Sequence, residues 1–251
     1  MDMDFSIKKP LHIIAFILIL ITFLFVIVAP LLTFFNVLPS IQNQETEQMI
    51  SVGGIFFEIF LLIIQLVIVI ATLILIPVLW YLLVNKISIK DSLKKMRLTF
   101  ENIDIAFLWG FVSVILIFGI IFVIELFLIY LGFNPEDMGN LQDLEYLFSP
   151  VTLFLLISIQ PIAEEIFFRG FLLEKIEGFA GKNIAIASTS ILFGVAHMSY
   201  GDLYPVLIPI FIGAIFAIIV IKTKSLYSSI IAHVIFNVSS FALAMLARSI
   251  T

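Results

Sequence analysis

The sequence has no cysteine among its 251 residues, and only 12% of its residues are charged. Without cysteine the chain can form no disulfide, no thiolate metal site and no thiol nucleophile. A soluble domain carries about twice this share of charge. The basic residues form no stripe and the formal net charge is −5, so the composition gives no sign of nucleic-acid binding.

Long hydrophobic runs are what the chain has instead: 62% of it is hydrophobic, with a mean hydropathy of +1.23. A helix of about 20 apolar residues crosses the ~30 Å hydrocarbon core of a bilayer. The sequence therefore predicts an all-α fold, a polytopic transmembrane helical bundle of about seven spans, or eight if a long run is broken. The expected spans are 11–35, 53–84, 105–133, 149–177, 184–199, 203–221 and 226–247.

Three of these runs are unusual in length. The first is longer than a signal-peptide core and lacks a small-x-small cleavage site, so we expect it to be retained as a span. The run 184–199 is short for a crossing, whereas 149–177 is longer than needed and contains Pro161, which can kink it. Since no repeat or linker divides the chain, we expect one integral membrane domain, with three spans in 1–148 and a C-terminal helical core in 149–251.

Basic residues mark one side of the membrane. The connection 85–104 holds five of them, whereas 36–52 and 134–148 hold acids and neither lysine nor arginine. Because cytoplasmic loops are rich in lysine and arginine, we expect a multi-pass protein of the cell membrane with a cytoplasmic N-terminus. The connection 85–104 is also weakly amphipathic, so it either lies on the cytoplasmic lipid surface or is a solvated loop.

A charged cluster interrupts the fourth run, in the stretch PIAEEIFFRG, residues 161–170. Glu165 and Arg169 are spaced i and i+4, with glutamate on the N-terminal side, which is the favourable order for an ion pair on a helix. Glu164 lies about 100° away around the helix and has Phe168, not Arg169, at its i+4 position. Intramembrane charges are costly and commonly functional, although a helix end that meets water would also explain them.

Two later runs supply further polar groups. His197 ends one apolar run, with Phe193 one turn before it, and His233 and Asn237 share one face of the last run. Taken singly, each has an ordinary explanation as a packing residue or an interhelical hydrogen bond. Glu164 lies 17 residues before Gly181 and His197 lies 16 after it. We therefore expect them at similar depth, in a cavity open to the cytoplasmic side.

These four polar residues can activate water against an amide bond. Glu164, removed from bulk water and near His197, suits the role of general base, with His197 orienting the water. His233 and Asn237 would then donate hydrogen bonds to the oxyanion. Glu165 and Arg169 would hold the helix in place and balance the charge of the site. No cofactor is needed for this chemistry.

A zinc site is the alternative for the same residues. Glu164, His197 and His233 form a His₂Glu set like that of some zinc hydrolases. The sequence has no H-E-x-x-H motif, the three residues lie on three different helices, and Asn237 is a poor zinc ligand. These observations favour water activated by glutamate over water activated by zinc.

Three motifs in order resemble those of the CPBP family, the CAAX proteases and bacteriocin-processing enzymes, which includes the Rce1-type prenyl proteases and Abi proteins. They are E-E-x-x-x-R, F-x-x-x-H and H-x-x-x-N, here at 164–169, 193–197 and 233–237. The stretch KTKSLYSSIIAH is similar to the segment that precedes the last histidine in this family. The resemblance covers about 150–240.

The resemblance implies an intramembrane endopeptidase that cleaves a hydrophobic or prenylated, CAAX-type peptide without a metal. It implies that Glu164 and His197 activate water, and that His233 and Asn237 form the oxyanion site. Some relatives are known mainly as immunity or regulatory membrane proteins. A non-catalytic protein that binds a peptide in the same cavity is therefore the rival interpretation. A transporter is disfavoured, because the polar groups cluster in the second half of the chain.

Overall fold

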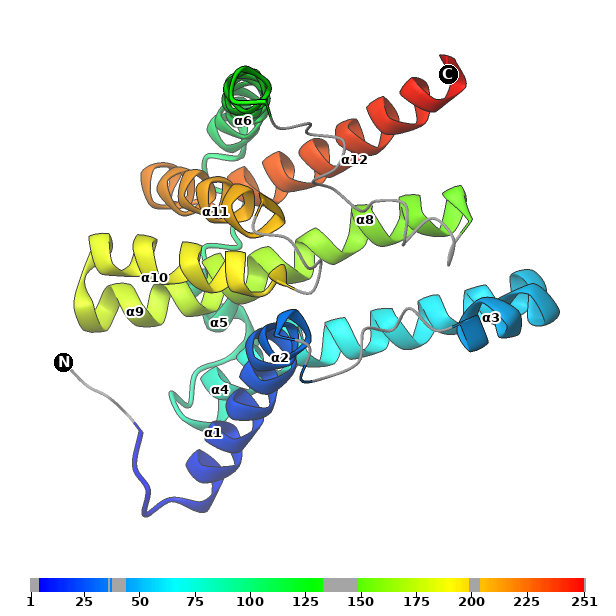
Figure 1. Ribbon diagram of the computed structural model, residues 1–251. Coiled ribbons are helices and arrows are strands. Elements are labelled where there is room, and N and C mark those ends of the chain that lie inside the picture. Colours follow the sequence, from blue (N-terminus) through cyan, green and yellow to red (C-terminus); the bar gives the residue numbers. More distant parts are fainter. Residues whose placement is uncertain (1–4, 36, 38–43, 133–148, 199–203, 251) are drawn as a thin grey trace.

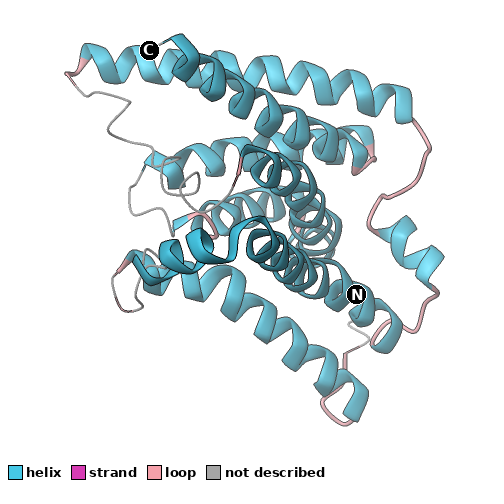
Figure 2. Ribbon diagram, turned by 90° about the vertical axis from the view of Figure 1, so that its right-hand side faces the viewer, coloured by secondary structure: helices cyan, strands magenta, loops and turns pink. Residues whose placement is uncertain are grey.

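The computed structural model of the protein describes residues 5–35, 37, 44–132, 149–198 and 204–250. These residues form helices and no strand (Figures 1 and 2), which confirms the predicted all-α fold. Six helical segments of the described chain are long and apolar enough to cross a membrane, and a seventh apolar helix is shorter. The protein is therefore a polytopic transmembrane helical bundle.

Several helices continue into one another through short π-helical segments, labelled η. The elements of the first half are α1 Pro10–Phe23, η1 Leu24–Val28, α2 Ala29–Phe34, α3 Gln44–Ile70, η2 Ala71–Leu75, α4 Ile76–Leu83, α5 Ile89–Lys95 and α6 Ile103–Tyr130. Those of the second half are α8 Pro150–Glu165, η4 Ile166–Leu172, α9 Leu173–Ala180, α10 Lys182–Val195, α11 Tyr204–Thr223 and α12 Tyr227–Ile250.

The predicted spans agree with these elements to within a few residues, except at two places. Helix α10 ends at Val195 rather than continuing to 199, and the run 53–84 is one span that begins after a bend at Gly54, where φ is 58°. The predicted ends at 133 and 203 lie outside the described residues.

Helix α8 is the centre of the arrangement. It packs against α12 on one side and against α3 and η2 on the other, and α10 lies along α11 (Figure 1). The N-terminus of α8 is capped from both sides. The Ser149 side chain accepts a hydrogen bond from the backbone N–H of Thr152 (3.4 Å), and the carboxylate of Glu58 in α3 accepts one from the backbone N–H of Ser149. A carboxylate at this end of a helix is stabilised by the helix dipole.

Prolines explain two of the π-helical segments. A proline ring clashes with the carbonyl group four residues before it. For Pro30 that carbonyl belongs to Val26 in η1, and for Pro77 it belongs to Leu73 in η2. The wider π-helical turn gives the ring room. The helix therefore crosses both positions without breaking.

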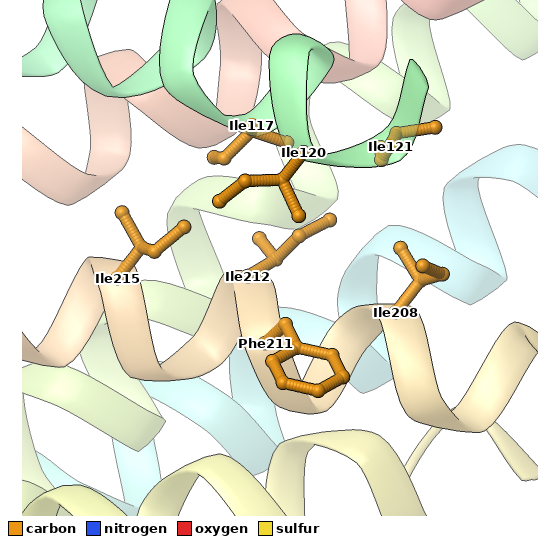
Figure 3. Close-up of a pocket in the computed structure, with 7 residues that line it drawn as sticks. All are labelled: Ile117, Ile120, Ile121, Ile208, Phe211, Ile212 and Ile215. Atoms are coloured by element: carbon orange, nitrogen blue, oxygen red, sulfur yellow. The ribbon is translucent and has the colours of Figure 1, made fainter. Parts of the chain in front are cut away.

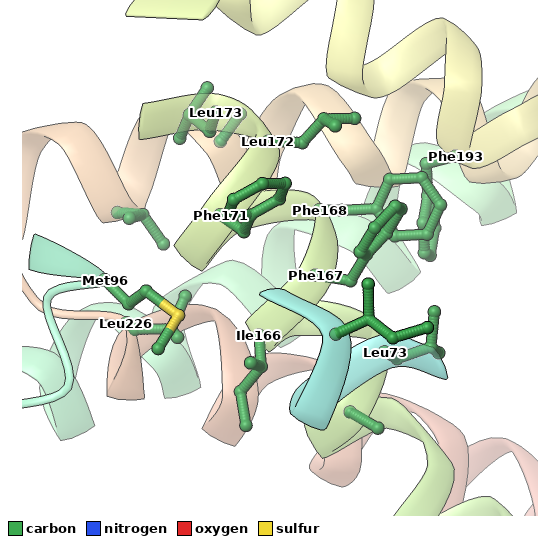
Figure 4. Packing of buried hydrophobic residues seen from close by; sticks show 14 of the residues in the cluster. Leu73, Met96, Ile166, Phe167, Phe168, Phe171, Leu172, Leu173, Phe193 and Leu226 are labelled. Atoms are coloured by element: carbon green, nitrogen blue, oxygen red, sulfur yellow. The ribbon is translucent and has the colours of Figure 1, made fainter. Parts of the chain in front are cut away.

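The segment η4 has no such proline. Helix α8 continues through Pro161 to Glu165, and η4 follows directly. Every residue of η4 is buried, and its aromatic side chains form the middle of the largest hydrophobic cluster (Figure 4). Insertions of this kind are frequent at functional sites, and this one carries Arg169.

A small gap between α6 and α11 has a wholly apolar lining. Isoleucines of α6 face isoleucines and one phenylalanine of α11 across a gap of about 10 Å³ (Figure 3). A gap of this size is at the lower limit for a single water molecule, and its lining offers no hydrogen bond. It is a packing defect between two lipid-embedded helices rather than a binding site.

Two polar contacts bring three connections of the chain to one face. The backbone N–H of Leu226, between α11 and α12, donates to the carbonyl of Arg97, between α5 and α6, at 2.9 Å. The guanidinium of Arg97 in turn pairs with Glu177, near the end of α9, at 2.5 Å. The chain therefore leaves this face at the end of α9 and has returned to it at the end of α11.

Candidate active site

The ion pair expected from the i and i+4 spacing is formed at the junction of α8 and η4. Arg169 Nη1 donates to Glu165 Oε1 at 2.9 Å, and both side chains are completely buried. Burying two charges is costly unless each has a partner. The short helical spacing gives each charge its partner within one turn.

Aromatic rings surround the guanidinium of Arg169. Its central carbon lies 4.1 Å from the centroid of the Phe193 ring, and 5.6 Å from those of Phe168 and Phe216. A desolvated cation over an aromatic face is stabilised by the ring quadrupole. The opposite side is closed by Gly213, where a Cβ atom would lie 2.9 Å from Arg169 Nη2. The guanidinium therefore has one position in which it fits.

His233 of α12 lies between the two adjacent glutamates. Its Nδ1 is 3.0 Å from Glu165 Oε1, and its Nε2 is 3.9 Å from Glu164 Oε2. An ionised carboxylate only accepts hydrogen bonds, so Nδ1 carries the proton and donates a hydrogen bond to Glu165. The two carboxylates, expected on different sides of the helix, thus face opposite nitrogens of one imidazole ring.

Glu164 has a second contact within its own helix. Gln160 Nε2 donates to Glu164 Oε1 at 2.7 Å, which leaves Oε2 directed toward His233. The Glu164 side chain is 12% exposed, in contrast to the fully buried Glu165. Of the adjacent pair, Glu164 is therefore the carboxylate that another molecule can reach. Sequence reasoning missed Gln160, although its i and i+4 spacing to Glu164 was visible.

His197 lies two residues beyond the end of α10, in a turn. Its Nδ1 is 2.7 Å from the backbone carbonyl of Phe193. A carbonyl only accepts, so Nδ1 carries the proton and Nε2 of the neutral ring is left with its lone pair.

Phe193 joins the parts of this group. Its ring centroid is 4.6 Å from that of His197 and 5.7 Å from that of His233, and it carries Arg169 on its face. Asn237 is partly buried one turn beyond His233, and within the described residues its carboxamide forms no hydrogen bond. The structure thus gathers the predicted glutamates, arginine and histidines around one phenylalanine, with Asn237 at the edge of the group.

A zinc site would need Glu164, His197 and His233 to converge on one point. In the part of the chain that the structure describes, no group of three histidine, aspartate or glutamate side chains is arranged to hold a metal ion. The Nδ1 atoms of both histidines act as hydrogen-bond donors, which leaves Nε2 as the open nitrogen of each ring.

Comparison with known families found a match in the C-terminal part of the chain. Residues 146–239 match the family model of the Rce1-like proteins, described as type II CAAX prenyl endopeptidases. This segment is therefore similar to the Rce1-like family. The Rce1-like segment includes all seven candidate residues and runs from the start of α8 into α12. No curated protein and no solved structure matches the chain.

Proposed function

We propose that the protein is an intramembrane endopeptidase that hydrolyses a peptide bond in a hydrophobic or prenylated, CAAX-type substrate, with water activated by Glu164. One observation carries the proposal: Glu164 is the partly exposed member of an adjacent carboxylate pair, and its Oε2 lies 3.9 Å from His233 Nε2. The family match is consistent with this activity. The substrate would reach the site from the membrane, because the spans around the site are embedded in lipid.

Water activation follows from the two hydrogen-bonding partners that the site leaves open. A water molecule between Glu164 and His197 would donate one hydrogen to the carboxylate and the other to the His197 Nε2 lone pair. Attack of its oxygen on the carbonyl carbon transfers the first proton to Glu164. When the C–N bond breaks, Glu164 returns that proton to the leaving amine. The products are a carboxylate and an amine, and Glu164 is regenerated.

The oxyanion formed by this attack needs hydrogen-bond donors. The Asn237 amide supplies one, and His233 supplies another only if its Nε2 carries a proton, because Nδ1 is committed to Glu165. The His233 role therefore requires the imidazolium form. Glu165 positions this ring, and Arg169 and Phe193 position Glu165 in turn.

We further propose that the cavity opens to the cytoplasmic side and that no metal takes part. The side assignment rests on the basic connections, which share one face. The metal assignment rests on the lack of an H-E-x-x-H motif and on the lack, among the described residues, of three side chains arranged to hold a metal ion. A glutamate general base commonly accelerates such a step by about 10²- to 10⁴-fold.

Cleavage of a prenylated CAAX peptide by the purified full-length protein tests this function. The wild type is compared with Glu164→Gln, each with and without a strong zinc chelator, and with Glu125→Gln, which alters a glutamate of α6 outside the site. We expect Glu164→Gln to lose at least about 100-fold in rate, Glu125→Gln to retain it, and the chelator to have no effect.

Two results would contradict this assignment in different ways. Loss of cleavage under the chelator would transfer water activation to zinc. No cleavage by any form, together with the same cellular phenotype for wild type and Glu164→Gln, would indicate a non-catalytic protein that holds a peptide in this cavity.

A further inference from the structure

A basic pocket lies away from the candidate active site, on the face where the three connections meet. Its cavity of about 490 Å³ is formed by the end of α5, the connection to α6, the end of α9 and the end of α11. The charged residues of its lining are Lys94, Lys95, Arg97, Lys224, Glu101 and Glu177. None of them belongs to the hydrolytic group, and Glu177 is 12 residues from Glu165 along the chain.

The pocket has more positive than negative charge. Four cations face two carboxylates, and one of these, Glu177, is already paired with Arg97 at 2.5 Å. The second terminal nitrogen of the guanidinium, Arg97 Nη1, is buried and has no hydrogen-bond partner among the described residues. A buried donor of this kind is costly unless a ligand or water accepts from it.

The backbone holds two of these cations in an unusual conformation. Arg97 has φ 60° and Lys224 has φ 56°, the left-handed region that side-chain-bearing residues rarely adopt. The hydrogen bond from Leu226 N–H to the Arg97 carbonyl ties the two connections together. Non-glycine residues in such conformations are found preferentially at ligand sites. Here both of them line the same cavity.

The neighbouring surface is suited to the membrane interface. Helix α5 exposes Ile89 and Leu93, one turn apart, beside the exposed Lys90 and Lys94. Phe100, next along the connection, is 77% exposed and stacks on Tyr227. Apolar side chains among lysines are typical of a helix that lies at the level of the lipid headgroups. The pocket therefore opens where phosphate groups of lipids are found.

We propose that this basic pocket binds the phosphate group of an anionic phospholipid. Its volume is within the range that encloses small ligands, and clusters of lysine and arginine at the cytoplasmic end of spans recognise such headgroups. Lys94, Lys95 and Lys224 would bind the phosphate oxygens, and the ion pair of Arg97 with Glu177 would hold the wall of the pocket in place. This site is independent of the proposed hydrolysis.

Equilibrium binding of dioctanoyl phosphatidylglycerol to the detergent-purified full-length protein tests the site, with dioctanoyl phosphatidylcholine as the neutral lipid. Each lysine near the surface strengthens binding of an anionic lipid by about fivefold. We expect the double variant Lys95→Gln/Lys224→Gln to raise the Kd for phosphatidylglycerol by about 10- to 25-fold. Lys94→Gln/Lys95→Gln, which leaves the left-handed backbone positions intact, should weaken binding in the same sense.

The matched control is Lys8→Gln/Lys182→Gln, which removes the same charge from exposed lysines outside the pocket and outside α5 and should change the Kd by less than about twofold. Equal weakening by the control, or equal binding of phosphatidylcholine, would overturn the proposal. Inorganic phosphate distinguishes the source of the ligand. Displacement of phosphatidylglycerol by millimolar inorganic phosphate would show that the site binds the soluble ion. Failure of inorganic phosphate to displace it would show that the site binds the lipid.

Discussion

At the scale of single residues, Arg169 is the largest side chain that is completely buried within the described structure. Its charge is met by one carboxylate and by the ring faces around it. Since Glu165 also receives the hydrogen bond from His233, a change at Arg169 is transmitted to the imidazole through a single carboxylate. Residues that touch no substrate can therefore control the geometry of the site.

A double-mutant cycle measures this dependence. Arg169→Met leaves the Glu165 charge buried without its cation, and we expect it to lower the free energy of unfolding by about 3–5 kcal/mol. Adding Glu165→Gln removes the uncompensated charge, so the double variant should be more stable than Arg169→Met alone. The measurement is SDS-induced unfolding in mixed micelles, followed by circular dichroism. Additive losses would show that the two charges do not depend on each other.

Gly213 provides the second prediction at this scale. A methyl group there would lie 2.9 Å from Arg169 Nη2 and 3.2 Å from the Ser190 Cα, so Gly213→Ala must displace the guanidinium. Overpacking of this kind costs about 1–3 kcal/mol, and we expect kcat to fall with little change in KM. Gly119→Ala, where no atom lies within 4 Å of the added carbon, is the control and should retain both. An unchanged kcat for Gly213→Ala would mean that Arg169 does not position the site.

At the scale of elements, the close approach of α10 and α11 sets the place of His197. A Cβ atom on Gly194 would lie 2.2 Å from Ile210 Cγ1 and 2.8 Å from the backbone oxygen of Val206. The backbone oxygen cannot move aside as a side chain can. The two helices can therefore pack at this distance only with glycine at 194.

Gly194→Ala should consequently separate α10 from α11. We expect a loss of stability larger than that of Gly213→Ala, and a loss of cleavage because His197 follows three residues later. Thermal unfolding of the detergent-purified variant and cleavage of the prenylated peptide measure the two effects. If peptide cleavage stayed at the wild-type rate despite lowered stability, the position of His197 would not depend on this contact.

The elements themselves could be predicted from the sequence, and their relative rotation could not. Apolar runs gave the helices, and the helical spacing gave the pair of Glu165 with Arg169. Contacts between helices depend on which faces meet, and hydropathy does not determine this for helices that are apolar all round. The contact of His233 with Glu165 and the stacking of Arg169 on Phe193 therefore came only from the structure.

Two further features could not be predicted from the sequence for related reasons. Glu58 caps α8 through the backbone of Ser149. Gly213 lets α11 approach α10 at Ser190 and also makes room for Arg169. Both roles depend on a partner distant in sequence, and one sequence shows no such partner.

At the scale of the whole molecule, the polar contacts on one face determine how often the chain crosses the membrane. The end of α9 and the end of α11 share this face, and α11 is long enough to cross. The chain must therefore reach the opposite side between them. We therefore predict a seventh crossing between α9 and α11, in addition to the six long spans of the described residues.

The cysteine-free sequence makes this topology simple to test. Single cysteines at Lys90, Lys182 and Ser249 would be exposed to a membrane-impermeant maleimide on one side only. With a cytoplasmic N-terminus, we expect Lys90→Cys and Lys182→Cys to react in inverted vesicles and Ser249→Cys to react in right-side-out vesicles. Labelling of Ser249→Cys and Lys90→Cys from the same side would show an even number of crossings.

The early end of α10 also bears on how the water molecule that attacks the substrate is held in the site. Fourteen helical residues rise about 21 Å, less than the ~30 Å of the hydrocarbon core. Helix α10 therefore stops inside the bilayer, where its last carbonyl groups need donors. The turn that follows α10 supplies three of these donors: the backbone N–H groups of Ala196 and His197 donate to Leu192 and Gly194, and His197 Nδ1 donates to Phe193. A helix end that satisfies its own carbonyl groups in this way can lie at this depth, and it leaves His197 Nε2 as the nitrogen open to a water molecule.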